Sequence, residues 1–257
     1  MKKQTISAEL YTVRNFTQNI SDIAETLKKI SLIGYRAVEI ACIGPVDIRE
    51  VAKITKDCGL EVCSTHTDWN RFLNELETVI EEHRILGCKH PAIGGLWGLD
   101  YYSADGAKRF LDDLAPISEK LAENGMDFSY HNHNHELTRY GDKTWLDTLY
   151  EKSDPDLLKA EIDVYWIQAG GGDPVQWIKK CANREPLLHL KDMTITPDRE
   201  TCFAPLGKGN LNWRTILNAA EESGVEYLIV EQDECYGQDP FEALEESYRY
   251  LKEIKQG

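Results

Sequence analysis

Four residues able to bind a metal ion stand at or just after the ends of four successive short apolar stretches. They are Glu136 in FSYHNHNHE, Asp163 in LLKAEIDVYW, His189 in PLLHLKD and Glu231 in YLIVEQDE. Each stretch is brief and is followed by polar residues, which is typical of a short buried strand. In a barrel of parallel strands such ends converge on one place, where these barrels carry out chemistry. Three carboxylates and one imidazole there predict a site for a divalent cation.

The spacing of these residues matches the length of a repeating strand–helix unit. Asp163 follows Glu136 by 27 residues, and His189 follows Asp163 by 26. Glu231 comes 42 residues after His189, beyond a longer loop and a helical stretch. A single acid at a strand end is unremarkable, but four consecutive units that each offer a metal-competent residue favour a common site.

The densest local motif is HNHNH at 131–135. Its alternating histidines are compatible with a zinc pair, but the corresponding HxH pair of metal-dependent amidohydrolases lies on the first strand of those barrels and this one lies on the fifth. We therefore take Glu136 as the ligand from this stretch. His131 and His133 are expected in the pocket lining, either as binding residues or as hydrogen-bonded wall residues without a chemical role.

Other residues near predicted strand ends are suited to binding a polar substrate. His66 ends the third strand, Trp166 follows the sixth, and Lys191 comes two residues after the predicted ligand of the seventh. A lysine there can hydrogen-bond hydroxyls or a carbonyl, and aromatic rings at a barrel mouth either pack against sugar faces or cap the core. We assign His66, His133, Trp166 and Lys191 to substrate binding.

Three further features carry no site prediction. Glu9 and Glu39, within the first two strands, are interpreted as satisfied internal polar residues. The GKG sequence at 207–209 resembles a phosphate-cradling loop but lacks the P-loop spacing and does not open a helix directly. No Ser-His-Asp set and no dinucleotide-binding fingerprint is recognised in the chain.

The elements that must position these residues form a repeat in which a helical stretch ends in glycine and a strand follows at once. The glycine supplies the left-handed backbone that stops a helix. Two more strands are expected near 158–163 and 186–191, and an opening strand near 4–11 brings the number to eight. The glycines that end helices are Gly34, Gly59, Gly87, Gly125 and Gly224.

Eight such units predict an α/β fold, a single-domain (β/α)8 TIM barrel over residues 1–257. A doubly wound open sheet is the alternative, but it usually carries a glycine-rich turn after its first strand. Here that position reads ELYTVRNF, without glycine. The barrel is therefore the favoured fold.

Composition and charge restrict the classes of partner. The net charge of −15 would repel phosphate polymers and anionic membranes, so we expect neither a nucleic-acid nor a membrane partner. The opening sequence MKKQTISAELYTVR has no apolar stretch that would make it a signal peptide or a membrane anchor. The 7 cysteines are scattered and form no CxxC motif. Together these features predict a cytoplasmic protein.

The motifs together resemble the xylose-isomerase-like TIM barrels, a superfamily of sugar isomerases, epimerases and inosose dehydratases that also includes endonuclease IV. The resemblance runs nearly end to end and is carried by ELYTVR, GYRAVEIA, YHNHNHE, EIDVYW, HLKD, LGKGNLNW and IVEQD. It implies that Glu136, Asp163, His189 and Glu231 are the ligands of one divalent ion. Mn²⁺ is the expected ion, with Mg²⁺, Co²⁺ and Zn²⁺ as alternatives.

The resemblance also implies a metal-dependent sugar isomerase or epimerase, with Glu136 and Glu231 as the acid/base pair. The cation would hold two adjacent oxygens of the substrate and acidify the C–H between them. One glutamate would remove that proton to give an enediolate, and the other would return it. The expected partner is a small sugar or cyclitol, and the expected assembly, where there is one, is a homodimer.

One departure from the ketose epimerases leaves other functions open. Three residues after Asp163 those enzymes carry a histidine, whereas this chain has Trp166. The alternative is a dehydratase or lyase acting on a keto-inositol or keto-glycoside. A nuclease like endonuclease IV would need three zinc ions and a basic surface, which the acidic composition disfavours. A sugar-binding barrel that has lost catalysis is the non-enzymatic alternative, and the presence of both glutamates argues against it.

Overall fold

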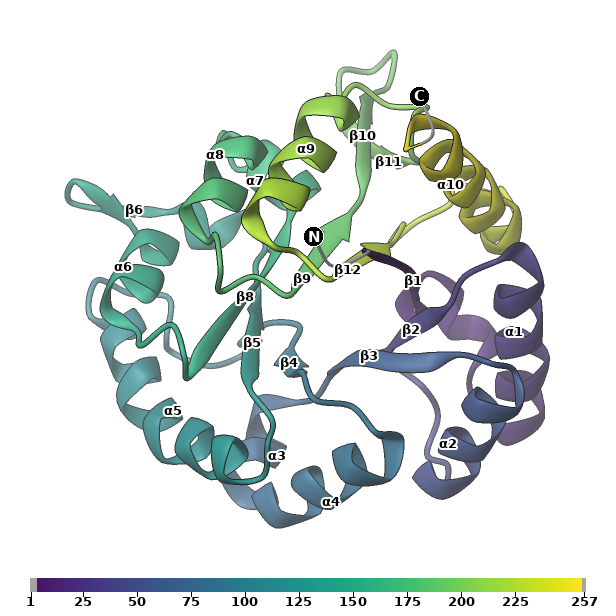
Figure 1. Cartoon of the computed structure of the whole chain (residues 1–257). Helices are drawn as coiled ribbons and strands as arrows, with labels where there is room; N and C mark the ends of the chain where they lie inside the picture. The colour runs from purple at the N-terminus through teal and green to yellow at the C-terminus, as the bar shows by residue number, and fades with distance from the viewer. Residues whose placement is uncertain (1–3, 256–257) are drawn as a thin grey trace.

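Within residues 4–255, which this computed structural model describes, eight parallel strands close a barrel (Figure 1). Their order around the barrel is β1-β12-β9-β8-β5-β4-β3-β2. The predicted (β/α)8 fold is confirmed, including the two strands that lack a preceding glycine. The barrel strands are β1 (Thr5–Glu9), β2 (Ala37–Ile40), β3 (Glu61–His66), β4 (Pro91–Ile93), β5 (Phe128–His131), β8 (Leu158–Asp163), β9 (Leu187–Leu190) and β12 (Tyr227–Val230).

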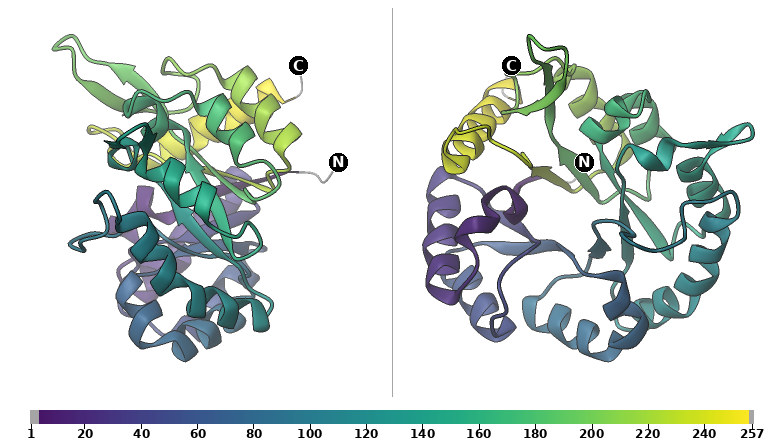
Figure 2. Two further views of the ribbon diagram at one scale, coloured as in Figure 1. Left: turned by 90° about the vertical axis from the view of Figure 1, so that its left-hand side faces the viewer. Right: turned by 180° about the vertical axis from the view of Figure 1, so that it is seen from behind.

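Helices surround the barrel and run back along its outer wall (Figures 1 and 2). Gly87 (φ 70°) and Gly224 (φ 85°) stop two of them in the left-handed conformation that favours glycine, as the sequence indicated. The α-helices are α1 (Ile20–Ile33), α2 (Ile48–Asp57), α3 (Trp69–Asn74), α4 (Leu76–Leu86), α5 (Gly106–Glu123), α6 (Trp145–Lys152), α7 (Val164–Ala169), α8 (Pro174–Lys180), α9 (Trp213–Ser223) and α10 (Pro240–Ile254). Two 3-10 helices, η1 (Leu10–Phe16) and η2 (His135–Leu137), follow β1 and β5.

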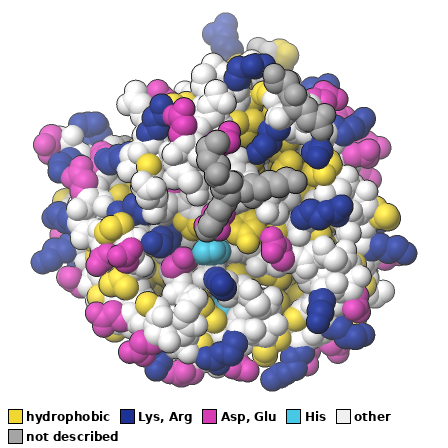
Figure 3. Space-filling view, in the orientation of Figure 1, with side chains coloured by type: hydrophobic (Ala, Val, Ile, Leu, Met, Phe, Trp, Pro, Cys, Tyr) yellow, Lys and Arg dark blue, Asp and Glu magenta, His cyan; other side chains and the backbone are white. Residues whose placement is uncertain are grey.

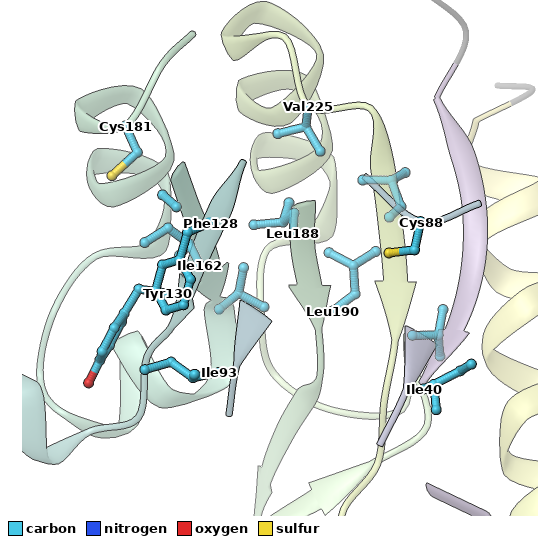
Figure 4. Packing of buried hydrophobic residues seen from close by; sticks show 14 of the residues in the cluster. Ile40, Cys88, Ile93, Phe128, Tyr130, Ile162, Cys181, Leu188, Leu190 and Val225 are labelled. Atoms are coloured by element: carbon cyan, nitrogen blue, oxygen red, sulfur yellow. The ribbon is translucent and has the colours of Figure 1, made fainter. Parts of the chain in front are cut away.

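The main hydrophobic core lies between the strands and the helices. Side chains that point outward from neighbouring strands, such as Phe128, Ile162 and Leu188, are fully buried in this shell (Figure 4). A smaller cluster of Ala37, Cys63, Leu187 and Ile229 fills the barrel itself. Because side chains alternate along a strand, residues two positions further on point the same way, one layer nearer the C-terminal end. In this barrel that next layer is polar.

The ends of the barrel differ in structure. Two antiparallel hairpins, β6 (Arg139–Tyr140) with β7 (Lys143–Thr144) and β10 (Asp192–Ile195) with β11 (Thr201–Ala204), extend the loops at the C-terminal ends of the strands. Figure 2 shows the β10–β11 hairpin projecting on the side away from the N-terminus. On the opposite face, basic and acidic side chains are interspersed (Figure 3). No helix within residues 4–255 is long and apolar enough to span a bilayer.

Candidate active site

Three of the four predicted ligands meet at the C-terminal end of the barrel. Asp163 ends β8, His189 lies in β9, and Glu231 follows β12 directly. His189 Nδ1 is 2.8 Å from Glu231 Oε2 and 3.9 Å from Asp163 Oδ2. All three side chains are buried, and one ligand atom from each lies within 4.8 Å of the others. We call these three residues the mouth group.

The fourth predicted ligand, Glu136, lies outside this group. Strand β5 ends at His131, and Glu136 comes five residues later in η2. Its Oε1 accepts hydrogen bonds from Tyr130 Oη at 3.0 Å and from Tyr102 Oη at 3.3 Å, while Oε2 accepts one from the backbone N–H of His133 at 2.8 Å. These contacts make Glu136 an anchor of the loop after β5, and the structure does not bring it to the mouth group.

Burial raises the pKa of Glu136 to about 7, against the effect of its hydrogen-bond donors. Folding therefore favours the protonated form of Glu136. The stability that this protonated carboxyl contributes is complete below about pH 4.5 and is lost as the pH rises through 7. Relative to the wild type, Glu136→Gln should gain on the order of 3 kcal/mol in free energy of unfolding between pH 4.5 and pH 8. Urea denaturation of both proteins at the two pH values measures this. An identical pH dependence in the two proteins would contradict the assignment.

Lys191 places its ammonium among the carboxylates of the mouth group. Its Nζ is 3.1 Å from Asp163 Oδ2, 2.9 Å from Glu231 Oε2 and 2.8 Å from Asp233 Oδ1. The side chain is 2% exposed, so water screens these charges little. Asp233 is not among the residues predicted from the sequence, although IVEQD carries two acids two residues apart directly after β12.

The pKa values of Glu231 and Asp233 are shifted in opposite directions. Although burial alone would raise the pKa of Glu231, the Lys191 ammonium and the hydrogen bond from His189 hold it well below its usual range. Burial and the negative charge of Glu231 raise the pKa of Asp233 to about 7. Two neighbouring carboxyls with opposite preferences can serve as base and acid in one reaction.

A second layer of polar residues lies beneath the mouth group. His189 Nε2 donates to Glu39 Oε2 at 2.6 Å, so a carboxylate orients the histidine. Such carboxylate–histidine pairs commonly support metal ligands. Glu39 is buried, as expected, but only its Oε2 is hydrogen-bonded, while Glu39 Oε1 and Oε2 of Glu9, which it faces across the β1–β2 pair, have no hydrogen-bond partner among the described residues. Although burial would lower the pKa of His189, Glu39 and Glu161 raise it well above its usual value.

Three of the four predicted substrate-binding residues, His66, His133 and Lys191, line one cavity of about 360 Å³ together with Glu231, and Trp166 is not in that lining. The Trp166 ring contacts two of these residues, with its centroid 5.3 Å from that of His133 and 5.6 Å from Lys191 Nζ. Within residues 4–255, Trp166 Nε1 and His133 Nδ1 are buried without a hydrogen-bond partner. The cavity is therefore of a size and polarity that suit a small polyol.

A larger cavity of about 800 Å³ adjoins the first beside the loops after β2 and β3. The two share Cys42, His66, Thr67 and Asp68 in their linings. The two cavities together therefore form a space larger than the smaller cavity alone.

The donor set of the mouth group fits a divalent cation. Asp163 Oδ1 accepts a hydrogen bond from the backbone N–H of Trp166, whereas Asp163 Oδ2 is buried and is directed toward Lys191 Nζ at 3.1 Å and His189 Nδ1 at 3.9 Å. Two carboxylates and one imidazole suit Mn²⁺ or Mg²⁺. A cation at His189 Nδ1 requires the neutral imidazole, whose remaining proton is directed to Glu39.

Comparison with known proteins places this geometry in a family. A model of the xylose isomerase-like TIM barrel matches residues 27–254. The chain belongs to this family. It is 22% identical over 268 residues to an inosose dehydratase from Clostridium beijerinckii, which covers 89% of this chain and 88% of that protein.

Two solved structures share the fold. A sugar phosphate isomerase/epimerase from Parabacteroides distasonis superposes with a TM-score of 0.80 and 24% identity, covering 98% of this chain and 94% of that one. A xylose isomerase-like TIM barrel protein from Mycobacterium smegmatis in complex with magnesium has a TM-score of 0.74 and 14% identity, covering 98% and 96%. The solved structures thus show the shared fold, and the similarity in sequence to an inosose dehydratase supports an enzymatic function.

The GKG sequence of this family member has a structural use. The backbone N–H groups of Gly207 and Gly209 donate to Asp192 Oδ2 at 2.8 and 3.1 Å, and Trp213 Nε1 donates to the same oxygen at 2.7 Å. Leu211 N–H donates to Oδ1 at 3.2 Å. A Cβ at Gly209 would lie 2.3 Å from Asp192 Oδ1, so the loop closes around a carboxylate of the chain itself.

Asp192→Ala should therefore destabilise the fold, because the buried Trp213 Nε1–H and three partly buried backbone N–H groups would lose their acceptor. We expect a loss of about 2–3 kcal/mol in free energy of unfolding, measured by urea denaturation. Asp198→Ala, at an exposed position of the β10–β11 hairpin, is the matched control and should change stability little. Equal stability of the two variants would show that the hydrogen bonds to Asp192 contribute nothing to the free energy of unfolding.

Proposed function

We propose that this protein is a cation-dependent lyase that removes water or an alcohol from a cyclic keto-polyol. The observation that supports this most directly is the arrangement of Glu231 and Asp233, which both contact Lys191 Nζ beside the cavity and differ in protonation preference. Base and acid on the same side of a bound ring suit an elimination in which a proton and the leaving group depart from one face.

The chain's own residues divide the steps between them. The Glu231 carboxylate takes the proton from the carbon next to the carbonyl, and the Lys191 ammonium donates a hydrogen bond to the oxygen on which negative charge gathers. The neighbouring C–O bond then breaks as the new C=C bond forms, and Asp233 gives its proton to the departing oxygen. A divalent cation at the mouth group, when bound, supplies charge that makes the C–H more acidic.

Two other features support an elimination. One is the similarity to an inosose dehydratase, whose name describes an elimination of water. The other is Trp166, which stands at the position where ketose epimerases are expected to carry a histidine. The adjoining cavity of about 800 Å³ leaves room for a keto-glycoside whose leaving group is an alcohol.

An isomerase or epimerase is the second candidate for the same site. It requires a second acid/base group across the substrate from Glu231, and Glu136 was the residue expected there. The Glu136 carboxylate is held by two tyrosine hydroxyls and a backbone N–H, and it is absent from the cavity lining described above. His133, which lines the cavity after β5, is the residue that would take its place.

Product analysis separates the two reactions. The protein is incubated with Mn²⁺ and a panel of keto-inositols, keto-glycosides and ketoses in D₂O. An elimination gives an ultraviolet absorption from the new conjugated double bond and a product lighter by water or an alcohol. Deuterium incorporation without any change in composition would support the epimerase and contradict the lyase. Neither change, across the whole panel, would favour a binding protein.

A further inference from the structure

The larger of the two cavities, of about 800 Å³, has no part in the acid/base steps described above. Its lining comes from the loop after β2, the end of β3 and helices α2, α3 and α4. It meets the smaller cavity at Cys42, His66, Thr67 and Asp68, which line both. Asp233, the proposed proton donor to the departing oxygen, also lines the smaller cavity. The larger cavity, which we call the side cavity, therefore opens onto the space where the proposed reaction takes place.

Hydrogen bonds hold the wall of the side cavity that the loop after β2 forms. Gln18 Nε2 donates to the carbonyl oxygen of Cys42 at 2.9 Å, and the Gly44 N–H donates to Thr17 O at 2.9 Å. A Cβ at Gly44 would lie 2.0 Å from Gln18 O, so the two backbones approach too closely there for a side chain. The side cavity therefore has a preformed wall, as ligand sites usually have.

Half-buried aliphatic side chains line two sides of the side cavity. One side is formed by the loop after β2 and the start of α2, and the other by the end of α4. These side chains are Ile43, Val46, Ile48, Ile85 and Leu86. All five lie within residues 4–255 and belong to the lining of the side cavity and not to that of the smaller one. Because removal of apolar surface from water is favourable, these walls suit an apolar part of a ligand.

The charged residues of the side cavity disfavour an anionic ligand. Arg71 Nη1 and Nη2 donate to the two carboxylate oxygens of Glu82 at 2.9 and 3.0 Å. Arg49 Nη1 lies 4.0 Å from Asp47 Oδ1. Among the described lining residues these two guanidiniums face five carboxylates, which are Asp47, Asp68, Glu77, Glu81 and Glu82. A phosphate or carboxylate would therefore be repelled there, whereas a neutral group would not.

A chain of hydrogen bonds directs one acceptor toward the junction of the two cavities. Burial lowers the pKa of His83, which favours the neutral imidazole. Because the Val79 carbonyl only accepts, His83 Nδ1 donates to it at 2.7 Å and Nε2 is left as an acceptor. Thr65 Oγ1 donates to Nε2 at 2.7 Å and accepts from Thr67 Oγ1 at 3.0 Å. The Thr67 oxygen therefore retains lone pairs that can accept from a hydroxyl group of a ligand.

We propose that the side cavity binds the leaving group of the reaction, and that this group is a neutral alcohol with an apolar body. The substrate is then a keto-glycoside of such an alcohol rather than a free keto-inositol or a sugar phosphate. The inference rests on the proposed function and leaves its acid/base pair unchanged.

The reaction balances without an oxidant or a reductant. Glu231 takes the proton from the carbon next to the carbonyl, and the bond to the alcohol oxygen breaks as the C=C bond forms. Asp233 gives one proton to that oxygen, so the products are an unsaturated ketone and the alcohol. The new hydroxyl group is a donor, for which Thr67 Oγ1 at the junction is the acceptor.

Binding of two glucosides that lack the keto group tests the site independently of catalysis. Methyl and cyclohexyl β-glucoside share the sugar and differ only in the alcohol. Isothermal titration calorimetry of the Mn²⁺-loaded protein should show the cyclohexyl glucoside bound about 10- to 100-fold more tightly, because more apolar surface leaves water. A carboxylate on the cyclohexyl ring should remove most of this advantage.

A bulky side chain in the side cavity should abolish the preference. Ile48→Trp is expected to bring the affinities for the two glucosides to within about threefold of each other. Ile54→Trp is the matched control and should keep the wild-type preference, because Ile54 is also a half-buried isoleucine of α2 but lines a separate cavity between α1 and α2. If circular dichroism shows that Ile48→Trp does not fold, Thr78→Trp takes its place, since Thr78 is an exposed residue of α4 that lines the side cavity.

Equal affinity of the wild type for the two glucosides would overturn the proposal, and so would a preference that the tryptophan variant retains. The corresponding keto-glycosides separate this inference from the proposed function. The cyclohexyl compound should release its alcohol with the higher kcat/KM. If neither compound released an alcohol while the binding preference held, the proposed lyase would be contradicted, and the assignment of the side cavity to the alcohol part of a glycoside would stand.

Discussion

Replacing Glu231 with glutamine is expected to lower kcat by about 10² to 10⁴-fold, the usual contribution of a positioned acid or base. The amide keeps the shape of the side chain but cannot take a proton from carbon. Its hydrogen-bonding partners are Lys191 Nζ at 2.9 Å and His189 Nδ1 at 2.8 Å, and both can still donate to the amide oxygen. The loss should therefore fall on the chemical step rather than on folding. Deuterium exchange at the carbon next to the carbonyl should fall in parallel.

The control for this variant is Glu234→Gln, three residues further along the chain. Glu234 pairs with Arg14 at 2.6 Å, and 61% of its side chain is exposed. It lies outside the cavity lining, so its loss should leave kcat within about twofold and stability nearly unchanged. Normal turnover by Glu231→Gln would remove Glu231 from the role of base and leave Asp233 as the carboxyl to test next.

The fold could be predicted because its signals are local. A helix that ends in glycine and leads directly into a short apolar strand needs no distant partner to be recognised, and Gly87 and Gly224 adopt the expected left-handed backbone. Parallel strands in a closed barrel then bring their C-terminal ends together. Asp163 and His189 could therefore be assigned to a common site before any contact was known.

Glu136 shows where a linear motif is insufficient. The apolar stretch before it runs to Tyr130, and six polar residues from His131 to Glu136 follow. The residue that ends β5 is the first of these, and the chain turns into η2 before it reaches the last. Hydrogen bonds from Tyr102 and Tyr130 fix where Glu136 lies, and one of those partners comes from a loop after another strand.

Glu161 was missed for a different reason. It is a single acid within an apolar stretch, and the group that contacts it, His66, comes from another strand. A buried carboxylate is tolerable only with such partners, which a single stretch does not reveal. One signal was nevertheless present: Glu161 precedes Asp163 by two residues, so a strand that directs one into the barrel directs both.

Lys191→Met is expected to make the stability of the protein strongly dependent on added cation. The Lys191 ammonium contacts Asp163, Glu231 and Asp233 within 3.1 Å, and those carboxylates raise its pKa well above the usual value against the effect of burial. Removal of one partner from a buried ion pair typically costs about 3–5 kcal/mol, because the opposite charges are left uncompensated. In metal-free buffer the variant should lose stability of that order.

A divalent cation should then restore much of the loss, because it would supply positive charge to the same two oxygens, Asp163 Oδ2 and Glu231 Oε2. Thermal unfolding with and without saturating Mn²⁺ measures this, and the increase in Tm should be larger for Lys191→Met than for the wild type. Lys53→Met is the control, since Lys53 is 79% exposed and pairs with Asp57 on the surface of α2. An equal response to Mn²⁺ in Lys191→Met and the wild type would mean that the lysine and the cation do not share these carboxylates. The mouth group would then hold its ion without displacing Lys191. Lys191 could therefore donate its hydrogen bond to the substrate oxygen whether or not the cation is bound.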